Sequence, residues 1–76
     1  MNKEFQMWLR AHGFVNTTGC YWVRGLFTFL RVWVHTHGGQ AEVVKIVRGN
    51  NFKRLSRTDH VSSIDELEKF FAPYLT

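Results

Sequence analysis

Residues 26–37 read Leu-Phe-Thr-Phe-Leu-Arg-Val-Trp-Val-His-Thr-His, a β-rich run whose two alternate registers differ in chemistry. Successive residues of a strand point to opposite faces of the sheet. One face then carries an aliphatic register: Leu26, Thr28, Leu30, Val32, Val34 and Thr36. The other carries an aromatic and cationic register: Phe27, Phe29, Arg31, Trp33, His35 and His37. The first register predicts a core-facing surface, and the second is typical of interfaces and of nucleic-acid platforms.

Five further runs complete the predicted fold. Residues 20–24 and 41–48 are rich in β-branched and aromatic side chains, and residues 52–57 predict a short fourth strand. Apolar residues spaced three and four apart predict helices over residues 3–12 and 64–72. The order α-β-β-β-(β)-α predicts one small α+β domain over residues 1–76. Its antiparallel sheet is expected to have three or four strands, with helices at the N- and C-terminal ends.

Turn signals separate these runs. Residues 16–19, Asn-Thr-Thr-Gly, are interpreted as a turn, and Gly38-Gly39 is interpreted as the two-residue loop of a hairpin. That loop would place His35 opposite Glu42. A one-residue bulge would instead pair Val34 with Val44, and the sequence leaves both registers open.

The last helix has a clear start signal. Ser63-Ile-Asp-Glu66 has the spacing of a capping box, in which the serine hydroxyl accepts from the backbone N–H of Glu66 and the glutamate side chain reaches back.

Length, charge and cysteine content narrow the class of protein. The chain has 76 residues, a formal net charge of +4 and one cysteine, Cys20. A single thiol forms no internal disulfide, which fits a reducing compartment. The first residues lack the pattern of a secretory signal, and no run approaches the roughly 20 apolar residues that span a bilayer. We therefore expect a cytoplasmic protein without a membrane partner, and the net charge favours an anionic partner.

No residue set points to catalysis or to a cofactor. His35, His37 and Glu42 come together at the predicted hairpin end, but two imidazoles and one carboxylate are too few for a well-defined zinc site. Cys20 has no histidine near it in sequence to activate it as a nucleophile, and Asp59-His60 precedes the last helix, where such residues usually cap or solvate. The sequence therefore predicts a protein that is not an enzyme and binds neither cofactor nor metal.

The strongest charge feature is the segment 45–57, which contains no acidic residue. Its five cations are the predicted binding residues for an anionic partner: Lys45, Arg48, Lys53, Arg54 and Arg57. Such a segment neutralises phosphates, or it keeps an exposed strand edge soluble and unpaired. Both interpretations stay open.

The α-β-β-β-α order resembles that of double-stranded-RNA-binding domains and of small toxins with the same layout. The stretch Trp8-Leu9-Arg10-Ala11-His12-Gly13-Phe14, followed by Thr18-Gly19-Cys20-Tyr21, resembles the start of HicA-type toxins. The Gly-Ser-His that supplies the catalytic histidine of that family is replaced here by Gly19-Cys20-Tyr21. Double-stranded-RNA-binding domains carry lysines at the start of the last helix, where this chain has Asp65 and Glu66. In size the chain is similar to short phage-encoded proteins that block host machinery.

These observations predict a non-enzymatic protein-interaction module, a small inhibitor or accessory protein whose partner is a nucleic-acid-handling protein or complex. The predicted partner-binding residues are Phe27, Phe29, Arg31, Trp33 and His35. The alternative is direct binding of DNA or RNA, with the cations on phosphates and the aromatic rings stacked on bases. Three alternatives remain for what covers the aromatic register. If one helix packs on each side of the sheet, a helix of the same chain covers it; otherwise a second copy in a homodimer or a partner covers it.

Overall fold

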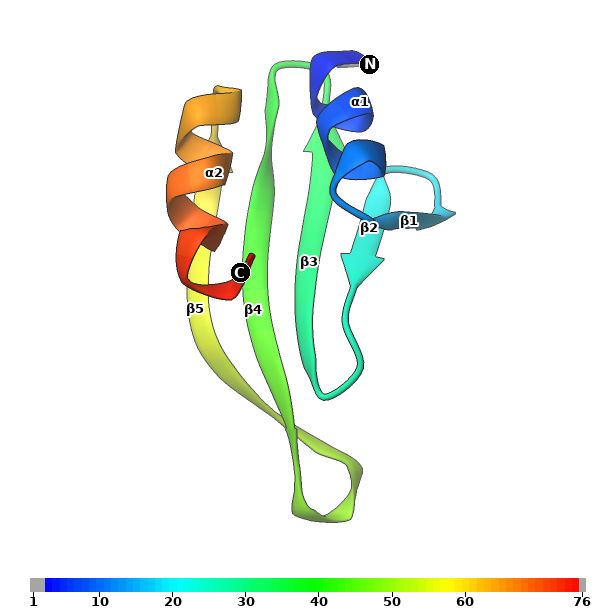
Figure 1. Ribbon diagram of the computed structural model, residues 1–76, viewed down its shortest axis with the longest axis vertical. Coiled ribbons are helices and arrows are strands. Elements are labelled where there is room, and N and C mark those ends of the chain that lie inside the picture. Colours follow the sequence, from blue (N-terminus) through cyan, green and yellow to red (C-terminus); the bar gives the residue numbers. More distant parts are fainter. Residues whose placement is uncertain (1–2, 76) are drawn as a thin grey trace.

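The computed structural model describes residues 3–75, the side chain of residue 50 excepted, and shows an α+β domain (Figure 1). Helix α1, Lys3–Ala11, precedes the sheet, and helix α2, Ile64–Phe71, follows it. The strands are β1 Val15–Thr18, β2 Tyr21–Arg24, β3 Thr28–His35, β4 Gly38–Val47 and β5 Asn51–Val61. Two short 3-10 helices complete the structure. The first, η1 Arg48–Asn50, lies between β4 and β5, and the second, η2 Ala72–Tyr74, follows α2. The predicted fold class is confirmed: an antiparallel sheet with one helix before it and one after it in the chain.

The sheet has five antiparallel strands in the order β1-β2-β3-β4-β5, so the prediction of three or four strands was wrong. The missed strand is β1, which the sequence suggested was a turn. Val15 pairs with Val23, and Asn16 pairs with Trp22. The Asn16 side-chain amide also donates to the backbone oxygens of Gly19 and Tyr21, both at 3.0 Å. Because all four β1 residues are exposed, the strand shows no alternation of apolar and polar residues.

The β3–β4 hairpin turns two residues earlier than the predicted Gly38-Gly39 loop, so neither predicted register is correct. Its two turn residues are Thr36 and His37, and Gly38 and Gly39 already pair with β3. The two glycines are required by close approach of neighbouring strands: a Cβ on Gly39 would lie 2.5 Å from the Trp33 carbonyl oxygen, and one on Gly38 would collide with the Val61 carbonyl. The resulting register places Arg31 opposite Glu42.

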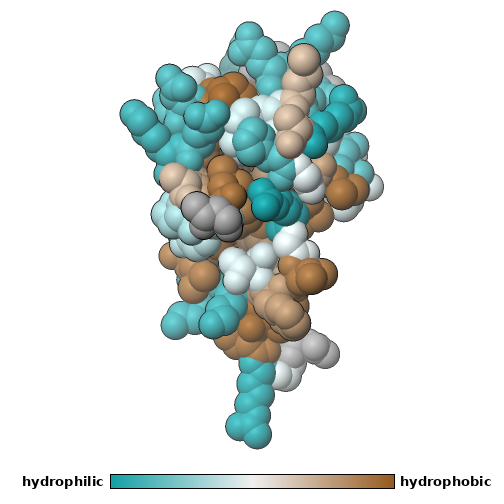
Figure 2. All heavy atoms as spheres, viewed as in Figure 1, coloured by the Kyte–Doolittle hydropathy of each residue, from teal (hydrophilic) through white to brown (hydrophobic). Residues whose placement is uncertain are grey.

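Strand β3 begins at Thr28, two residues later than expected. Leu26 is 79% exposed and Phe27 is 77% exposed, because both lie in the loop between β2 and β3. The prediction that Leu26 faces the core is therefore wrong. In Figure 2 hydrophobic side chains reach the surface in the lower half of the molecule, away from the two helices. The fourth predicted strand is also longer than expected and forms the edge strand β5.

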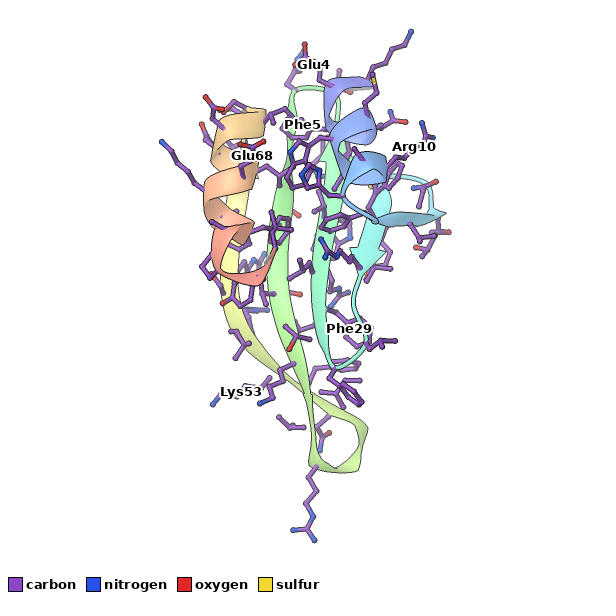
Figure 3. All side chains as sticks on the ribbon, viewed as in Figure 1. Glu4, Phe5, Arg10, Phe29, Lys53 and Glu68 are labelled. Carbon is purple, nitrogen blue, oxygen red and sulfur yellow. The ribbon has the colours of Figure 1, made fainter. Side chains whose placement is uncertain are left out.

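Both helices lie on the same face of the sheet, in front of β3, β4 and β5 in Figure 1. Of the three alternatives left open by the sequence, the one with a helix on each face is therefore wrong. Phe5, which lies between the helices and the sheet in Figure 3, and Leu9 pack from α1, while Leu67 and Phe71 pack from α2. The other core residues come from the aliphatic register of β3 and from neighbouring elements: Trp8, Phe14, Trp22, Leu30, Val32, Val34, Ala41, Val43 and Val61. Burial of Leu30, Val32 and Val34 confirms that register as core.

Helix α2 starts as the capping box predicts. The Ser63 hydroxyl accepts from the backbone N–H of Glu66 at 3.2 Å. The Glu66 carboxylate reaches one residue further back than expected, where it accepts from the Ser62 hydroxyl at 2.7 Å and from its backbone N–H at 3.2 Å. These hydrogen bonds hold the pKa of Glu66 below its usual value. The Trp8 indole N–H donates to Glu68 at 3.0 Å and so joins the two helices.

Candidate functional site

The sheet face opposite the helices is the candidate site, and we call it the open face. Within residues 3–75 no helix packs on it. Strands β2 to β5 all contribute, because the pairing registers bring their outward residues side by side. The open face comprises Tyr21, Val23, Phe29, Arg31, Trp33, Glu42, Val44, Phe52, Arg54 and Arg57.

A carboxylate held by two guanidinium groups lies at the centre of the open face. Glu42 is only 8% exposed although no helix covers it. Arg31 donates to its Oε1 at 3.1 Å, and Arg54 donates to its Oε2 at 2.8 Å. Each oxygen of the buried carboxylate therefore has a charged donor, which offsets the cost of removing it from water.

Two aromatic rings fix the position of Arg31. Its guanidinium carbon lies 5.3 Å from the ring centroid of Tyr21 and 5.0 Å from that of Trp33. Its Nε also donates to the Tyr21 hydroxyl at 2.9 Å. Because cation–π contacts and hydrogen bonds act on one group, the guanidinium is held in place before any partner binds.

Beside this cluster the open face has an apolar hollow. It has a volume of about 340 Å³ and is lined by Tyr21, Val23, Phe29, Arg31, Val44 and Phe52. The rings of Phe29 and Phe52 meet edge to face, with centroids 6.3 Å apart. Val44 is buried at this hollow, whereas Phe52 is 62% exposed. The hollow therefore offers aromatic and aliphatic contact surface to a side chain from outside.

The charges of the open face nearly cancel. The guanidinium groups of Arg31, Arg54 and Arg57 are offset by Glu42 and by Asp59, which accepts from Arg57 at 2.8 Å. Three cations and two carboxylates give this face a formal charge of +1. Arg54 and Arg57 keep 57% and 46% of their side-chain surface exposed, so they are accessible to a further acceptor.

The structure brings together only part of the predicted partner-binding set. Phe29, Arg31 and Trp33 lie on the open face and are half-buried. Phe27 lies in the β2–β3 loop, and His35 ends β3 next to the turn, where it is exposed. Five residues of the open face were not predicted to bind a partner: Tyr21, Val23, Glu42, Val44 and Phe52. Alternation along residues 20–24 was the available signal for Tyr21 and Val23, whereas Glu42 and Phe52 depended on the register.

The five predicted cations do not form one patch. Arg54 and Arg57 lie on the open face. Lys45 and Lys53 are cross-strand neighbours on the helix side, and Arg48 lies in the turn between β4 and β5. The basic segment is therefore distributed over both faces and one end of the molecule.

The residues expected to be weak candidates for chemistry stay apart. No group of three His, Cys, Asp or Glu side chains within residues 3–75 is close enough to hold a metal ion. The Glu42 carboxylate is bonded to arginines, and Cys20 is partly buried just before β2. No helix in the same part of the chain combines the length and apolar character needed to cross a bilayer.

No protein-family model matches the chain, and no curated protein or solved structure is significantly similar to it.

Proposed function

We propose that the protein is a non-enzymatic interaction module whose open face binds a protein partner. The partner inserts an apolar side chain into the hollow and brings a carboxylate to Arg54 and Arg57. The observation that supports this proposal is an apolar hollow beside a nearly neutralised arginine cluster, on a sheet face that no helix of residues 3–75 covers. Aromatic and arginine side chains around such a hollow are typical of energetically important interface residues.

The charge of the face favours a protein over a nucleic acid. A phosphate backbone needs several cations whose charge is available, and two carboxylates already neutralise two of the three arginines here. Direct nucleic-acid binding is therefore the second candidate.

The same charges argue against a second copy of this chain. Stacking two open faces would bring Arg54 and Arg57 of both copies to one interface, with a formal charge of +1 on each side. Like charges facing each other at an interface are unfavourable. A partner with an acidic rim and an apolar projection fits the face better. That this partner belongs to the nucleic-acid-handling machinery, with the chain as its inhibitor or accessory protein, remains a prediction.

The test begins with the partner itself. A photo-crosslinking amino acid at position 52 captures the proteins that touch the open face in the cells that produce the chain, and one at position 7 provides the control. Phe52 and Met7 are 62% and 68% exposed and lie on opposite sides of the sheet. The captured protein is then purified, and its affinity for three forms of the chain is measured by calorimetry: wild type, Phe52→Ser and Met7→Ser.

We expect Phe52→Ser to weaken binding about tenfold or more, because it removes an anchor of the hollow, and Met7→Ser to leave affinity unchanged. Equal affinities for all three forms would refute the proposal. Labelled single- and double-stranded DNA and RNA are titrated at two salt concentrations in parallel. Micromolar binding that falls steeply with salt and is lost in the Arg54→Glu, Arg57→Glu variant would establish the nucleic-acid alternative instead.

A further inference from the structure

A second hollow lies on the helix side of the sheet, beyond the end of α2, and we call it the basic hollow. Its volume is about 460 Å³. It is lined by Arg24, Gly25, Thr28, Leu30, Lys45, Leu55 and Tyr74, so β2, β3, β4, β5 and η2 all contribute to it. Leu30 belongs to the core that the helices cover, which places this hollow on the side of the sheet opposite the open face.

Cations border the basic hollow without acidic partners. Arg24 ends β2, and Lys45 lies on β4 directly opposite Lys53 of β5. Like charges directly opposite each other on neighbouring strands destabilise a sheet. No salt bridge within residues 3–75 involves Arg24, Lys45 or Lys53. An anion placed beside these residues would relieve that repulsion.

The distribution of acids strengthens this argument. In Figure 3 Lys53 lies at the lower end of the sheet, whereas Glu4 and Glu68 lie at the helix end. The sequence has no acidic residue from residue 5 to residue 41 or from residue 43 to residue 58. The two carboxylates on these strands, Glu42 of β4 and Asp59 of β5, are bound to arginines, and no acidic residue lines the basic hollow.

The remaining lining side chains are apolar or hydroxyl-bearing. Leu30 is 3% exposed and Leu55 is 42% exposed, and together they present aliphatic surface to the hollow. Thr28, directly opposite Lys45, and Tyr74 each supply a hydroxyl group. Cations and hydroxyls beside aliphatic walls suit a ligand with one charged end and one apolar end.

We propose that the basic hollow binds a small organic anion, with a phosphate-ester or carboxylate head at Arg24 and Lys45 and an apolar body against Leu55 and Tyr74. The proposal is independent of the protein partner, because the two sites lie on opposite faces of the sheet. The basic hollow shares no residue with the open face except through the strands themselves, so an anion could bind in it even if the open face bound no partner.

The probe is phenyl phosphate, titrated into the isotope-labelled chain and followed by NMR shifts of the Thr28 amide and the Leu55 methyl groups. Inorganic phosphate provides the control without an apolar body, and benzyl alcohol provides the control without a charge. We expect saturable binding of phenyl phosphate that is about fivefold or more tighter than that of either control. Equal binding of inorganic and phenyl phosphate would mean an adventitious ion only and would overturn the proposal.

Matched charge variants locate the site. Lys45→Gln and Arg24→Gln each remove one cation from the hollow, and Arg48→Gln removes one from the β4–β5 turn outside it. We expect the first two variants to weaken phenyl phosphate binding about tenfold and the third to change it less than about twofold. An equal loss in all three variants would show attraction to net charge alone and would overturn the proposal.

Lys53→Glu separates binding from folding. It replaces a like-charge cross-strand pair with an opposite-charge pair, so we expect it to raise the midpoint of thermal unfolding while it weakens phenyl phosphate binding. A variant that unfolds at a higher temperature yet binds as the wild type does would contradict the placement of the anion beside Lys45, the cross-strand neighbour of Lys53.

Discussion

Glu42 is the residue on which the open face depends most. Replacing it with alanine leaves Arg31, whose side chain is only 33% exposed, without its carboxylate and removes the acceptor of Arg54. We expect Glu42→Ala to lower the free energy of unfolding by about 1–3 kcal/mol, measured by urea denaturation.

Asp59→Ala provides the matched control for this measurement. It also removes one carboxylate from an arginine, but the Asp59 side chain is 76% exposed. Exposed ion pairs contribute little, so we expect a loss below about 1 kcal/mol. A larger effect from Asp59→Ala than from Glu42→Ala would contradict the central position given to Glu42.

Gly39 tests the hairpin register. In the observed pairing with Val34, an added Cβ lies 2.5 Å from the Trp33 carbonyl oxygen, which is backbone and gives way only with a shift of the strand. We therefore expect Gly39→Ala to destabilise the fold by about 1–3 kcal/mol in the same urea experiment. A change in stability of only a few tenths of a kcal/mol would contradict this close approach of β3 and β4.

The burial of single residues was predicted correctly from the sequence where the two-residue alternation of a strand alone decides it. Leu30, Val32 and Val34 follow from alternation within one strand. The partners of Arg31 do not, because they depend on where the hairpin turns, and a shift of one residue exchanges the faces of a whole strand. Two adjacent glycines gave the same local signal whether they formed the loop or lay in the strand beside it.

Among the elements, the start of α2 carries a prediction about pH. Because the Ser62 hydroxyl donates to the Glu66 carboxylate, the pKa of Glu66 lies below its ordinary value of 4.5. A carboxylate whose pKa is depressed by folding contributes stability above its unfolded pKa, and that contribution is lost as the pH falls through the folded pKa. We expect Ser62→Ala to raise the pKa of Glu66 towards 4.5, measured by NMR titration of its side-chain carboxyl.

Helices and strands differed in how well the sequence predicted them. Both helices have a regular apolar period, and α2 also has a capping box, so their positions were confirmed to within about one residue. Strand β1 was missed because its four residues are all exposed and carry no apolar alternation. Its existence depends on pairing with β2, a contact that local composition does not encode.

For the molecule as a whole, the decisive finding is that both helices cover one face. Apolar stripes on two helices show that each packs on a sheet, but they do not say on which side. The connections decide it: α1 enters β1 through Gly13 and Phe14, and Phe14 then packs with Phe71 of α2, with ring centroids 5.6 Å apart. No helix of residues 3–75 therefore covers the aromatic register of β3. The sequence alone left three alternatives open for what covers it.

The most direct measurement is an NMR map of the chain bound to its crosslinked and purified partner. Val23 and Val44 report on the hollow of the open face, and Met7 reports on the outer surface of α1. We predict that the methyl signals of both valines shift on binding while that of Met7 does not. Shifts at Met7 with unchanged valine signals would contradict the assignment of the open face as the binding surface.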